Sequence, residues 1–161
     1  EEIWRYLPKG SAKEKSVHLS LFPEEEVLKF DDNLTRNWEL LVQLKSEVSK
    51  ASEASRRNKV IGHSLDSIVK LELPPEMKKS LRQYSEELKF LFIVSEVKLV
   101  EKLKDDEGVY FSELLPGVKI FTERHRGKKC ERCWHYFYVE TSGINSLNCE
   151  RCQSHLQIAG G

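Results

Sequence analysis

The feature that most constrains the fold is the arrangement of the four cysteines, which all lie near the C-terminal end of the 161-residue chain. Cys130 and Cys133 form one C-x2-C pair, Cys149 and Cys152 form a second, and fifteen residues separate the pairs. This spacing is typical of a zinc site, because two tight turns can direct four sulfur atoms at one tetrahedral ion. We therefore expect one zinc ion in a C-terminal four-cysteine ribbon or knuckle.

Other interpretations of these cysteines remain open. Two disulfide bonds would use the same residues, but they need an oxidising compartment that no other feature of the chain indicates. His125, His135 or His155 could replace one thiolate, although four thiolates already complete the coordination shell. A complete shell has no open position for water or substrate, so the predicted metal is structural and not catalytic.

The chain contains none of the short motifs that commonly carry catalysis. It has eight glycines but no phosphate-binding glycine loop, and neither a G-x-S-x-G elbow nor an H-E-x-x-H motif occurs. Asp105, Asp106 and Glu107 stand beside Gly108, a pattern more typical of a solvated turn than of paired acid–base carboxylates. The sequence therefore predicts no catalytic residue.

Charge is unevenly distributed, although 26 Lys and Arg residues balance 26 Asp and Glu residues over the whole chain. Between residues 119 and 135, two acidic side chains stand against six basic ones: Lys119, Arg124, Arg126, Lys128, Lys129 and Arg132. Aromatic residues follow at once, beginning with Trp134, which we expect to be exposed because it follows a knuckle thiol. Cations that meet phosphates and rings that stack on unpaired bases are typical of nucleic-acid binding. Neutralisation of the zinc thiolates by these cations is the competing interpretation.

Hydrophobic periodicity predicts an α+β fold. Residues 1–30 read as irregular, and a long amphipathic helix is expected from Asp31 to about Lys59. After it we expect a strand over residues 65–73, a helix over 75–89, a strand over 91–100 and a strand over 118–122. The order β-α-β-β predicts a small α+β subdomain before the zinc module. His63, which follows Gly62, is expected in a loop or cap.

Several motifs give the chain a resemblance to bacterial-type isoleucyl-tRNA synthetases. Residues 129–136, KCERCWHY, together with residues 149–152, CERC, resemble the C-terminal zinc module of that family. Residues 2–8, EIWRYLP, and residues 86–90, EELKF, are similar to segments further upstream in it, as is Glu47-Val48 with Lys50. The resemblance therefore covers nearly the whole chain, although residue 63 is His where the family often has Gly.

The resemblance implies a division into three parts. Residues 1–62 would be the end of a helical anticodon-binding domain, whose bundle supplies the long helix, residues 63–124 the small α+β subdomain, and residues 125–161 the zinc-binding module. The family attaches isoleucine to its tRNA with ATP and Mg²⁺ in a catalytic domain, which is implied to lie outside this chain. The chain would then be inactive alone.

The resemblance also implies partners and contact residues. The partners would be tRNA(Ile) and the catalytic, editing and helical domains of the same protein, in a monomer without membrane contact. Arg132 and Trp134 would lie near anticodon nucleotides, with further contacts from Arg124, Arg126, Lys128 and Lys129. The location would be cytoplasmic in a bacterium, or plastid or mitochondrial in a eukaryote.

Two rival functions share the cysteine spacing. A DNA-repair glycosylase of the formamidopyrimidine type has a similar zinc finger, but its chemistry uses an N-terminal Pro followed by Glu, whereas this chain begins with Glu1. A non-enzymatic zinc ribbon for protein contacts is the second rival, and it would make Arg132 and Trp134 neutral for RNA affinity.

Overall fold

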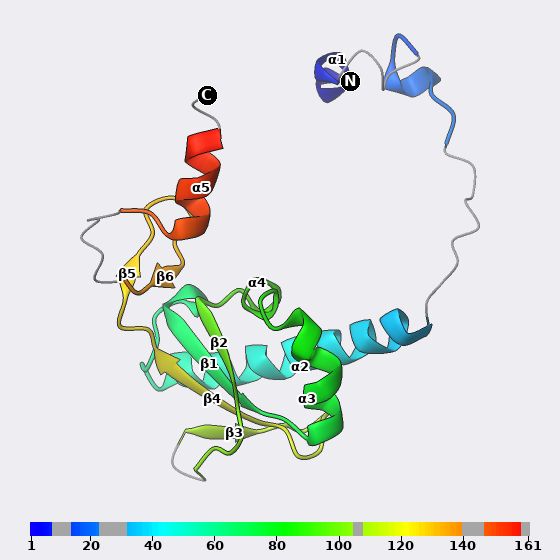
Figure 1. The fold of residues 1–161 in the computed structure, drawn as a ribbon. Helices are drawn as coiled ribbons and strands as arrows, with labels where there is room; N and C mark the ends of the chain where they lie inside the picture. The colour runs from blue at the N-terminus through cyan, green and yellow to red at the C-terminus, as the bar shows by residue number, and fades with distance from the viewer. Residues whose placement is uncertain (8–13, 23–31, 105–107, 140–146, 159–161) are drawn as a thin grey trace. The chain divides into compact units, whose positions relative to one another are not determined.

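The computed structural model describes residues 1–7, 14–22, 32–104, 108–139 and 147–158. The chain forms two compact units, residues 1–31 and residues 32–161. The second unit contains a four-stranded sheet, the helices that cover it and both cysteine pairs (Figure 1). The predicted α+β class is thereby confirmed. The predicted turn at residues 105–107 lies outside the described residues.

The first unit contains short helical turns where the sequence predicted irregular structure. Helix α1 (Glu2–Tyr6) and the 3-10 turn η1 (Val17–Leu19) lie in its described residues. The Trp4 indole N–H donates a hydrogen bond to the carbonyl oxygen of Glu14 at 3.1 Å. Local hydrogen bonds of this kind hold the described pieces together, because none of their side chains is fully buried.

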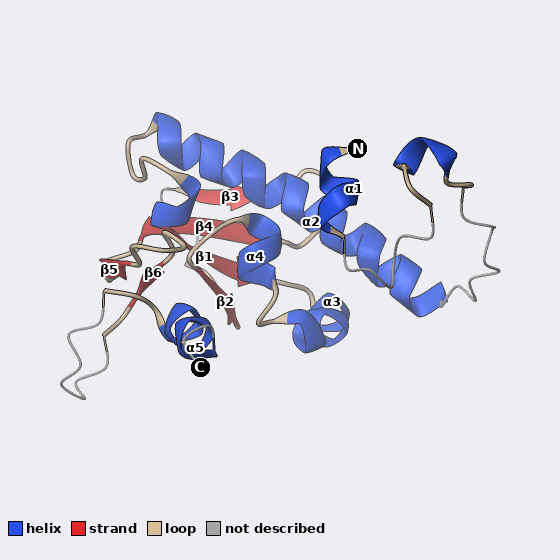
Figure 2. Ribbon diagram, turned by 90° about the horizontal axis from the view of Figure 1, so that it is seen from above, coloured by secondary structure: helices blue, strands red, loops and turns tan. Residues whose placement is uncertain are grey.

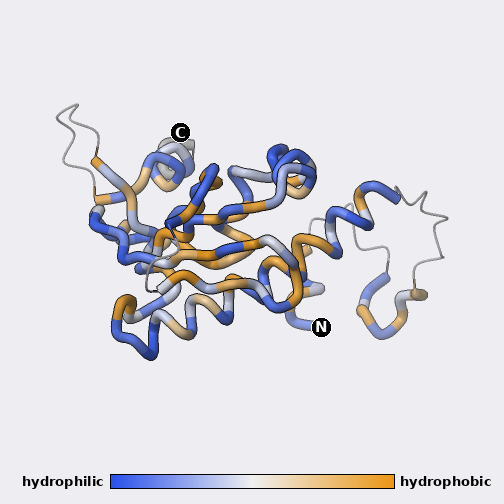
Figure 3. The backbone as a smooth tube through the Cα atoms, turned by 90° about the horizontal axis from the view of Figure 1, so that it is seen from below, coloured by the Kyte–Doolittle hydropathy of each residue, from blue (hydrophilic) through white to orange (hydrophobic). Residues whose placement is uncertain are grey.

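The second unit begins with the long helix α2 (Asp32–Arg57), which agrees with the predicted helix to within two residues. Its buried apolar side chains recur at helical spacing: Leu41, Leu44, Val48 and Ala51. In Figure 3 the tube accordingly alternates along this helix between orange, for hydrophobic residues, and blue, for hydrophilic residues. Neither α2 nor any other helix in the described part of the chain is long and apolar enough to cross a membrane.

Two residues after helix α2 ends, a lysine adopts the left-handed conformation. Lys59 has a φ of 59°, and the backbone N–H of Val60 donates to the carbonyl oxygen of Ser55 at 2.9 Å. This bond satisfies one of the carbonyl groups that a helix end leaves open. His63 then caps the 3-10 turn η2 (Ser64–Asp66), because its Nδ1 accepts from the Leu65 N–H at 3.2 Å, which confirms the predicted cap.

The sheet contains β1 (Ser67–Glu72), β2 (Glu96–Val100), β3 (Val109–Phe111) and β4 (Lys119–Arg124) in the order β2-β1-β4-β3. Strands β1 and β2 are parallel, whereas β4 is antiparallel to both of its neighbours. Strand β3 was missed by the sequence analysis, because three residues are too few to show a periodicity.

The connection between β1 and β2 differs from the prediction. The single helix expected over residues 75–89 is divided into α3 (Pro75–Leu81), the turn η3 (Arg82–Tyr84) and α4 (Leu88–Phe92). The expected strand over 91–100 was also wrong in its first half, because Ile93 adopts a left-handed φ of 57° and pairing with β1 begins at Glu96. Both segments bury their apolar side chains, so periodicity alone could not locate the break.

One core joins the helices to one face of the sheet, and Figure 2 shows α2 lying along the sheet. Val69 and Leu71 of β1 and Ile120 of β4 are fully buried in this core against α2. The opposite face carries cross-strand polar pairs, such as Lys70 with Glu123 at 2.9 Å. Such alternation is typical of a sheet with one face packed and one face in solvent.

A buried carboxylate joins α2 to the segment after β3. Glu47 is completely buried, and its Oε2 accepts from the Ser112 hydroxyl at 2.6 Å and from the Glu113 N–H at 2.7 Å. Its Oε1 lies 2.8 Å from the Lys50 ammonium. Burial alone would raise the pKa of Glu47, but these hydrogen bonds hold it at about 2. The ionised carboxylate is therefore a structural element of the fold.

Candidate metal centre and nucleic-acid interface

The fold brings the four cysteine sulfurs into one cluster, in which all of them lie within 4.8 Å of one another. The Sγ atoms of Cys133 and Cys149 are 3.6 Å apart, and the side chains of Cys130 and Cys152 are buried. Zn–S bonds of about 2.3 Å in a tetrahedron place sulfur atoms about 3.8 Å apart. The donor set and its spacing therefore fit a single metal ion.

Each cysteine pair lies on a different kind of element. The first pair occupies the turn between the short strands β5 (Lys128–Lys129) and β6 (Tyr136–Phe137), which are antiparallel. The second pair lies at the start of α5 (Glu150–Ile158), a helix that the sequence analysis did not predict. Because β5 and β6 are each two residues long, the cysteine cluster is the element that fixes this turn against the helix.

Backbone N–H groups point at the buried thiol of Cys130. The N–H of Cys149 donates to its Sγ at 3.4 Å. Burial would raise the pKa of Cys130, but N–H groups of Cys133, Cys149 and Arg132 bring it down to about 6. The surroundings therefore favour the thiolate, which is the form that binds a metal ion.

The side chain of His125 lies away from the sulfur cluster. It is almost fully buried, its Nδ1 accepts from the Gly127 N–H at 2.9 Å, and its Nε2 lies 3.5 Å from a carboxylate oxygen of Glu96. A side chain at position 127 would place a Cβ only 2.3 Å from the Phe137 carbonyl oxygen, so this close approach requires glycine. Burial lowers the pKa of His125. His125 thus belongs to the connection between the sheet and the part formed by β5, β6, α5 and the two cysteine pairs, which we call the cysteine module.

Ser95 joins the cysteine module to the sheet through one buried hydroxyl. Its Oγ accepts from the Tyr136 N–H of β6 at 2.6 Å and donates to the Leu65 carbonyl oxygen at 2.5 Å. The Ser95 N–H also donates to the carbonyl oxygen of Ser67 in β1 at 3.2 Å. These bonds set the position of the module on the sheet.

Replacing Ser95 by Ala is expected to loosen this connection. The change leaves the Tyr136 N–H and the Leu65 carbonyl without their partner, which costs about 1–3 kcal/mol for a buried group. Hydrogen exchange of the Tyr136 amide should become faster and the free energy of unfolding should fall. Ser49→Ala is the control, because the Ser49 hydroxyl is exposed on α2 and donates to the carbonyl oxygen of Lys45 in the same helix. Equal exchange in wild type and Ser95→Ala would contradict this role.

The predicted nucleic-acid contacts are all exposed. They follow one another from the end of β4 to the cysteine turn: Arg124, Arg126, Lys128, Lys129, Arg132 and Trp134. The side chain of Trp134 is 59% exposed, and the Lys129 ammonium lies 5.3 Å from the centre of its ring. The structure thus brings a cation and an exposed indole together beside the sulfur cluster.

Trp134 also has an unusual backbone conformation. Its φ is 65°, a left-handed value that is rare for a bulky residue, and its N–H donates to the Cys130 carbonyl at 3.0 Å. The turn that directs the cysteine sulfurs inward therefore directs the indole outward. Residues held in such conformations are often found at functional sites.

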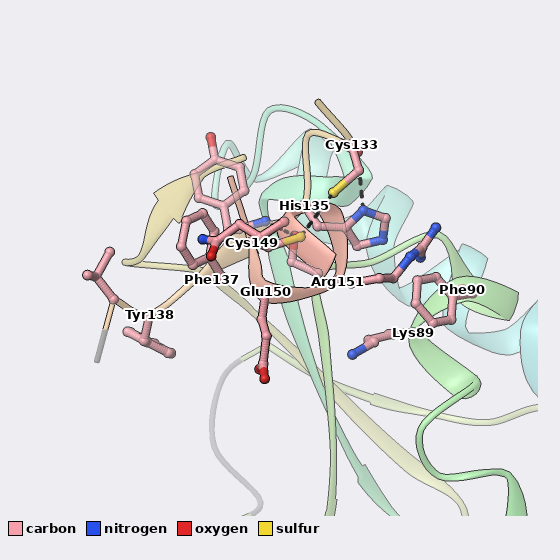
Figure 4. A pocket seen from close by; sticks show the side chains of 13 residues that line it. Lys89, Phe90, Cys133, His135, Phe137, Tyr138, Cys149, Glu150 and Arg151 are labelled. Carbon is pink, nitrogen blue, oxygen red and sulfur yellow. Dashed lines mark hydrogen bonds between the residues drawn. The ribbon is translucent and has the colours of Figure 1, made fainter. Parts of the chain in front are cut away.

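Three residues beside the cluster were not singled out from the sequence. Lys89 and Phe90 of α4 and Arg151 of α5 line a hollow of about 540 Å³ between the sheet unit and the cysteine module (Figure 4). We call it the α4–α5 hollow. The place of Arg151 between Cys149 and Cys152 could have marked it as a residue of the site. Its contact with Phe90, however, is visible only in the folded structure.

Together, the fold and the cysteine cluster define a class of protein: a four-cysteine module that could hold a metal ion, with a basic and aromatic surface, carried on a small α+β unit. No protein-family model matches the chain. Curated relatives do match. The isoleucine–tRNA ligase of Geobacter sulfurreducens is 43% identical over 136 residues, which are 84% of this chain and 14% of that protein.

Other relatives carry the same name. The isoleucine–tRNA ligase of Syntrophotalea carbinolica is 40% identical over 154 residues, or 94% of this chain and 16% of that protein. That of Staphylococcus carnosus is 38% identical over 157 residues, or 95% of this chain and 16% of that protein. The chain belongs to the isoleucine–tRNA ligase family. It spans about one sixth of the length of these relatives.

Proposed function

We propose that this chain is the C-terminal, tRNA-binding part of an isoleucine–tRNA ligase and that it contacts the anticodon stem-loop through its cysteine module. The complete protein would attach isoleucine to its tRNA with ATP and Mg²⁺, in a catalytic domain outside this segment. The observation that supports the proposal most is the exposure of the Trp134 indole, which a turn with a left-handed backbone holds beside exposed cations. Trp134 and its basic neighbours would bind RNA and would carry out no chemical step.

We infer that the metal is zinc, bound by Cys130, Cys133, Cys149 and Cys152. Four thiolates are a donor set typical of structural zinc, and the ion would supply rigidity to the turn and no reactive position. The Sγ atoms of Cys133 and Cys149 lie 3.6 Å apart, well beyond the roughly 2.05 Å of a disulfide bond, and all four cysteines are free thiols, which supports a metal site over disulfides.

In the proposed contact, the basic side chains and the indole ring bind different parts of the RNA. The exposed cations Arg124, Arg126, Lys128, Lys129 and Arg132 would meet backbone phosphates, so affinity should fall as salt concentration rises. Trp134 would stack on an unpaired anticodon-loop base, because such loops present bases that a helix conceals. In this arrangement the cations attract the RNA electrostatically, and stacking on the indole fixes the position of one base.

The proposal also covers how the chain is divided into parts, what its partners are and where the protein is located. Residues 125–161 would form the zinc-binding module, residues 63–124 the subdomain that carries it, and residues 1–62 the end of a helical anticodon-binding domain. The other domains of the same chain and tRNA(Ile) would be the partners, in a monomeric protein. The relatives come from bacteria, which supports a cytoplasmic location.

Replacing Trp134 by Ala is expected to weaken binding of an isoleucine-tRNA anticodon stem-loop by about 1–3 kcal/mol, the free energy of stacking on one base. Fluorescence anisotropy with labelled RNA measures this change. Trp38→Ala is a matched control, because Trp38 is 57% exposed on α2 but lies away from the cysteine module. Equal affinities of the two variants would contradict the proposed contact.

A second set of ligands tests the rival functions. The zinc-loaded chain should bind isoleucine tRNA better than another tRNA and better than damaged duplex DNA. Equal affinity for all three would leave only a general electrostatic attraction. A preference for damaged DNA would favour the glycosylase alternative, and no RNA affinity would favour a protein-binding ribbon.

A further inference from the structure

The α4–α5 hollow combines an aromatic ring with two cations from different elements. The Arg151 guanidinium of α5 lies 4.6 Å from the centre of the Phe90 ring, and the Lys89 ammonium of α4 lies 5.3 Å from it. The ring of His135 packs at 5.7 Å from the same ring. Figure 4 shows Arg151 extending from α5 toward Phe90, with His135 beside them. The ring is therefore contacted by side chains of α4, of α5 and of the turn that precedes β6.

The size and exposure of the hollow suit a small flat ligand. Its volume of about 540 Å³ lies within the range of sites that hold small organic molecules. The Phe90 side chain remains 40% exposed in spite of its neighbours, and Arg151 is exposed as well. A guanidinium plane held against a phenyl ring has a second face, which can stack on a nucleobase.

Two cations on the lining of the hollow can meet an anionic strand. Lys89 and Arg151 contribute two positive charges, Glu150 contributes one negative charge, and Cys133 and Cys149, which also line the hollow, would be thiolates when zinc is bound. The hollow adjoins the turn that carries Trp134, because its lining includes Cys133, the residue directly before Trp134.

We propose that the α4–α5 hollow is a second RNA-binding site, which receives an unpaired nucleotide next to the one that contacts Trp134. The base stacks on the Arg151–Phe90 pair, and Lys89 meets the adjoining phosphate. This inference rests on the proposed function. It adds RNA contacts from α4, which packs on the sheet, to the contacts from the cysteine module. The alternative role of Arg151 and Lys89 is to balance the net charge of −2 of a zinc ion with four thiolates.

The test compares two variants of the hollow in the zinc-loaded chain. Phe90→Leu keeps an apolar side chain but removes the ring, and it should weaken binding of the isoleucine-tRNA anticodon stem-loop by about tenfold. Arg151→Gln should also weaken binding, because it removes the guanidinium plane on which the base stacks. Arg82→Gln is the matched control, because Arg82 is exposed on η3 outside the hollow, and it should change affinity by less than Arg151→Gln.

A position-specific probe locates the second nucleotide. Single 2-aminopurine substitutions along the RNA loop should reveal a base whose fluorescence is quenched by the wild-type chain and by Trp134→Ala but not by Phe90→Leu. Wild-type affinity in both hollow variants, with weakened binding in Trp134→Ala, would overturn the second site and leave the proposed function intact. Wild-type affinity in all three would overturn the proposed function as well. If Arg151→Gln loses zinc, Phe90→Leu alone decides between RNA contact and charge balance.

Discussion

Removal of the metal is expected to unfold the cysteine module and to leave the four-stranded sheet folded. Among the side chains that the structure describes from residue 126 onward, only Cys130 and Cys152 are buried, so the module has no hydrophobic core to replace the metal. Zinc binding contributes about 10–16 kcal/mol to the folding of small zinc modules. The sheet has a separate core, made by α2, β1 and β4.

Hydrogen exchange read residue by residue measures this separation. After chelation, the amides of Cys130 and Trp134 should lose protection, because they bond only within the module. Amides of β1 and β4 should keep theirs. Cys130→Ser should give the same pattern in the presence of zinc, and metal analysis of the wild type should find one zinc ion per chain. Retained protection at Trp134 in the chelated protein, or a stoichiometry of zero or two, would refute the zinc assignment.

Replacing Glu47 by Gln is expected to lower the free energy of unfolding by about 2–3 kcal/mol. The amide keeps the shape of the side chain but removes the charge that Lys50, Ser112 and the Glu113 N–H surround. Removing one partner from a buried hydrogen-bonded ion pair lowers the free energy of unfolding strongly, because the remaining groups stay buried without their partner. Urea unfolding followed by circular dichroism measures the change. Glu113→Gln is the matched control, because its carboxylate contacts the same Lys50 but is 73% exposed, and such pairs contribute about 0–1 kcal/mol.

The effect of Glu47 should depend on pH in a defined direction. Its pKa in the folded chain is about 2, below the ordinary value of 4.5. A depressed pKa stabilises the fold fully above the ordinary value, and the stabilisation disappears as pH falls from there toward about 2. The difference in unfolding free energy between wild type and Glu47→Gln should therefore narrow in acid. A difference that stays constant from about pH 6 to about pH 3 would contradict the assigned pKa.

The elements that could be predicted are those whose signal is local and unbroken. Helix α2 carries a long run of apolar residues at spacings of three and four, and no Gly or Pro interrupts it. The grouping of the four cysteines was predictable for a similar reason, since each C-x2-C pair is one tight turn. Exposure of Trp134 followed from its place directly after such a turn.

The features that escaped prediction depend on contacts between distant residues. Leu81 and Leu88 are both fully buried, and two short helices separated by a turn satisfy their spacing as well as one helix would. Helix α5 has little apolar periodicity, and its cysteine pair fixes its first turn against the cluster. The α4–α5 hollow needs Phe90 and Arg151 side by side, which no spacing in the sequence indicates.

The strand order has a consequence for synthesis of the chain. Strand β4 is the last of the sheet to be made, yet it lies between β1 and β3. Until residue 124 has left the ribosome, β1 has an open edge, and open edges invite pairing with other chains. The first cysteine pair follows β4 after the short strand β5, and the second pair, Cys149 and Cys152, is made later still. Closure of the sheet therefore becomes possible before the four-cysteine site is complete, and slow synthesis up to residue 124 prolongs the period in which the open edge of β1 can pair with another chain.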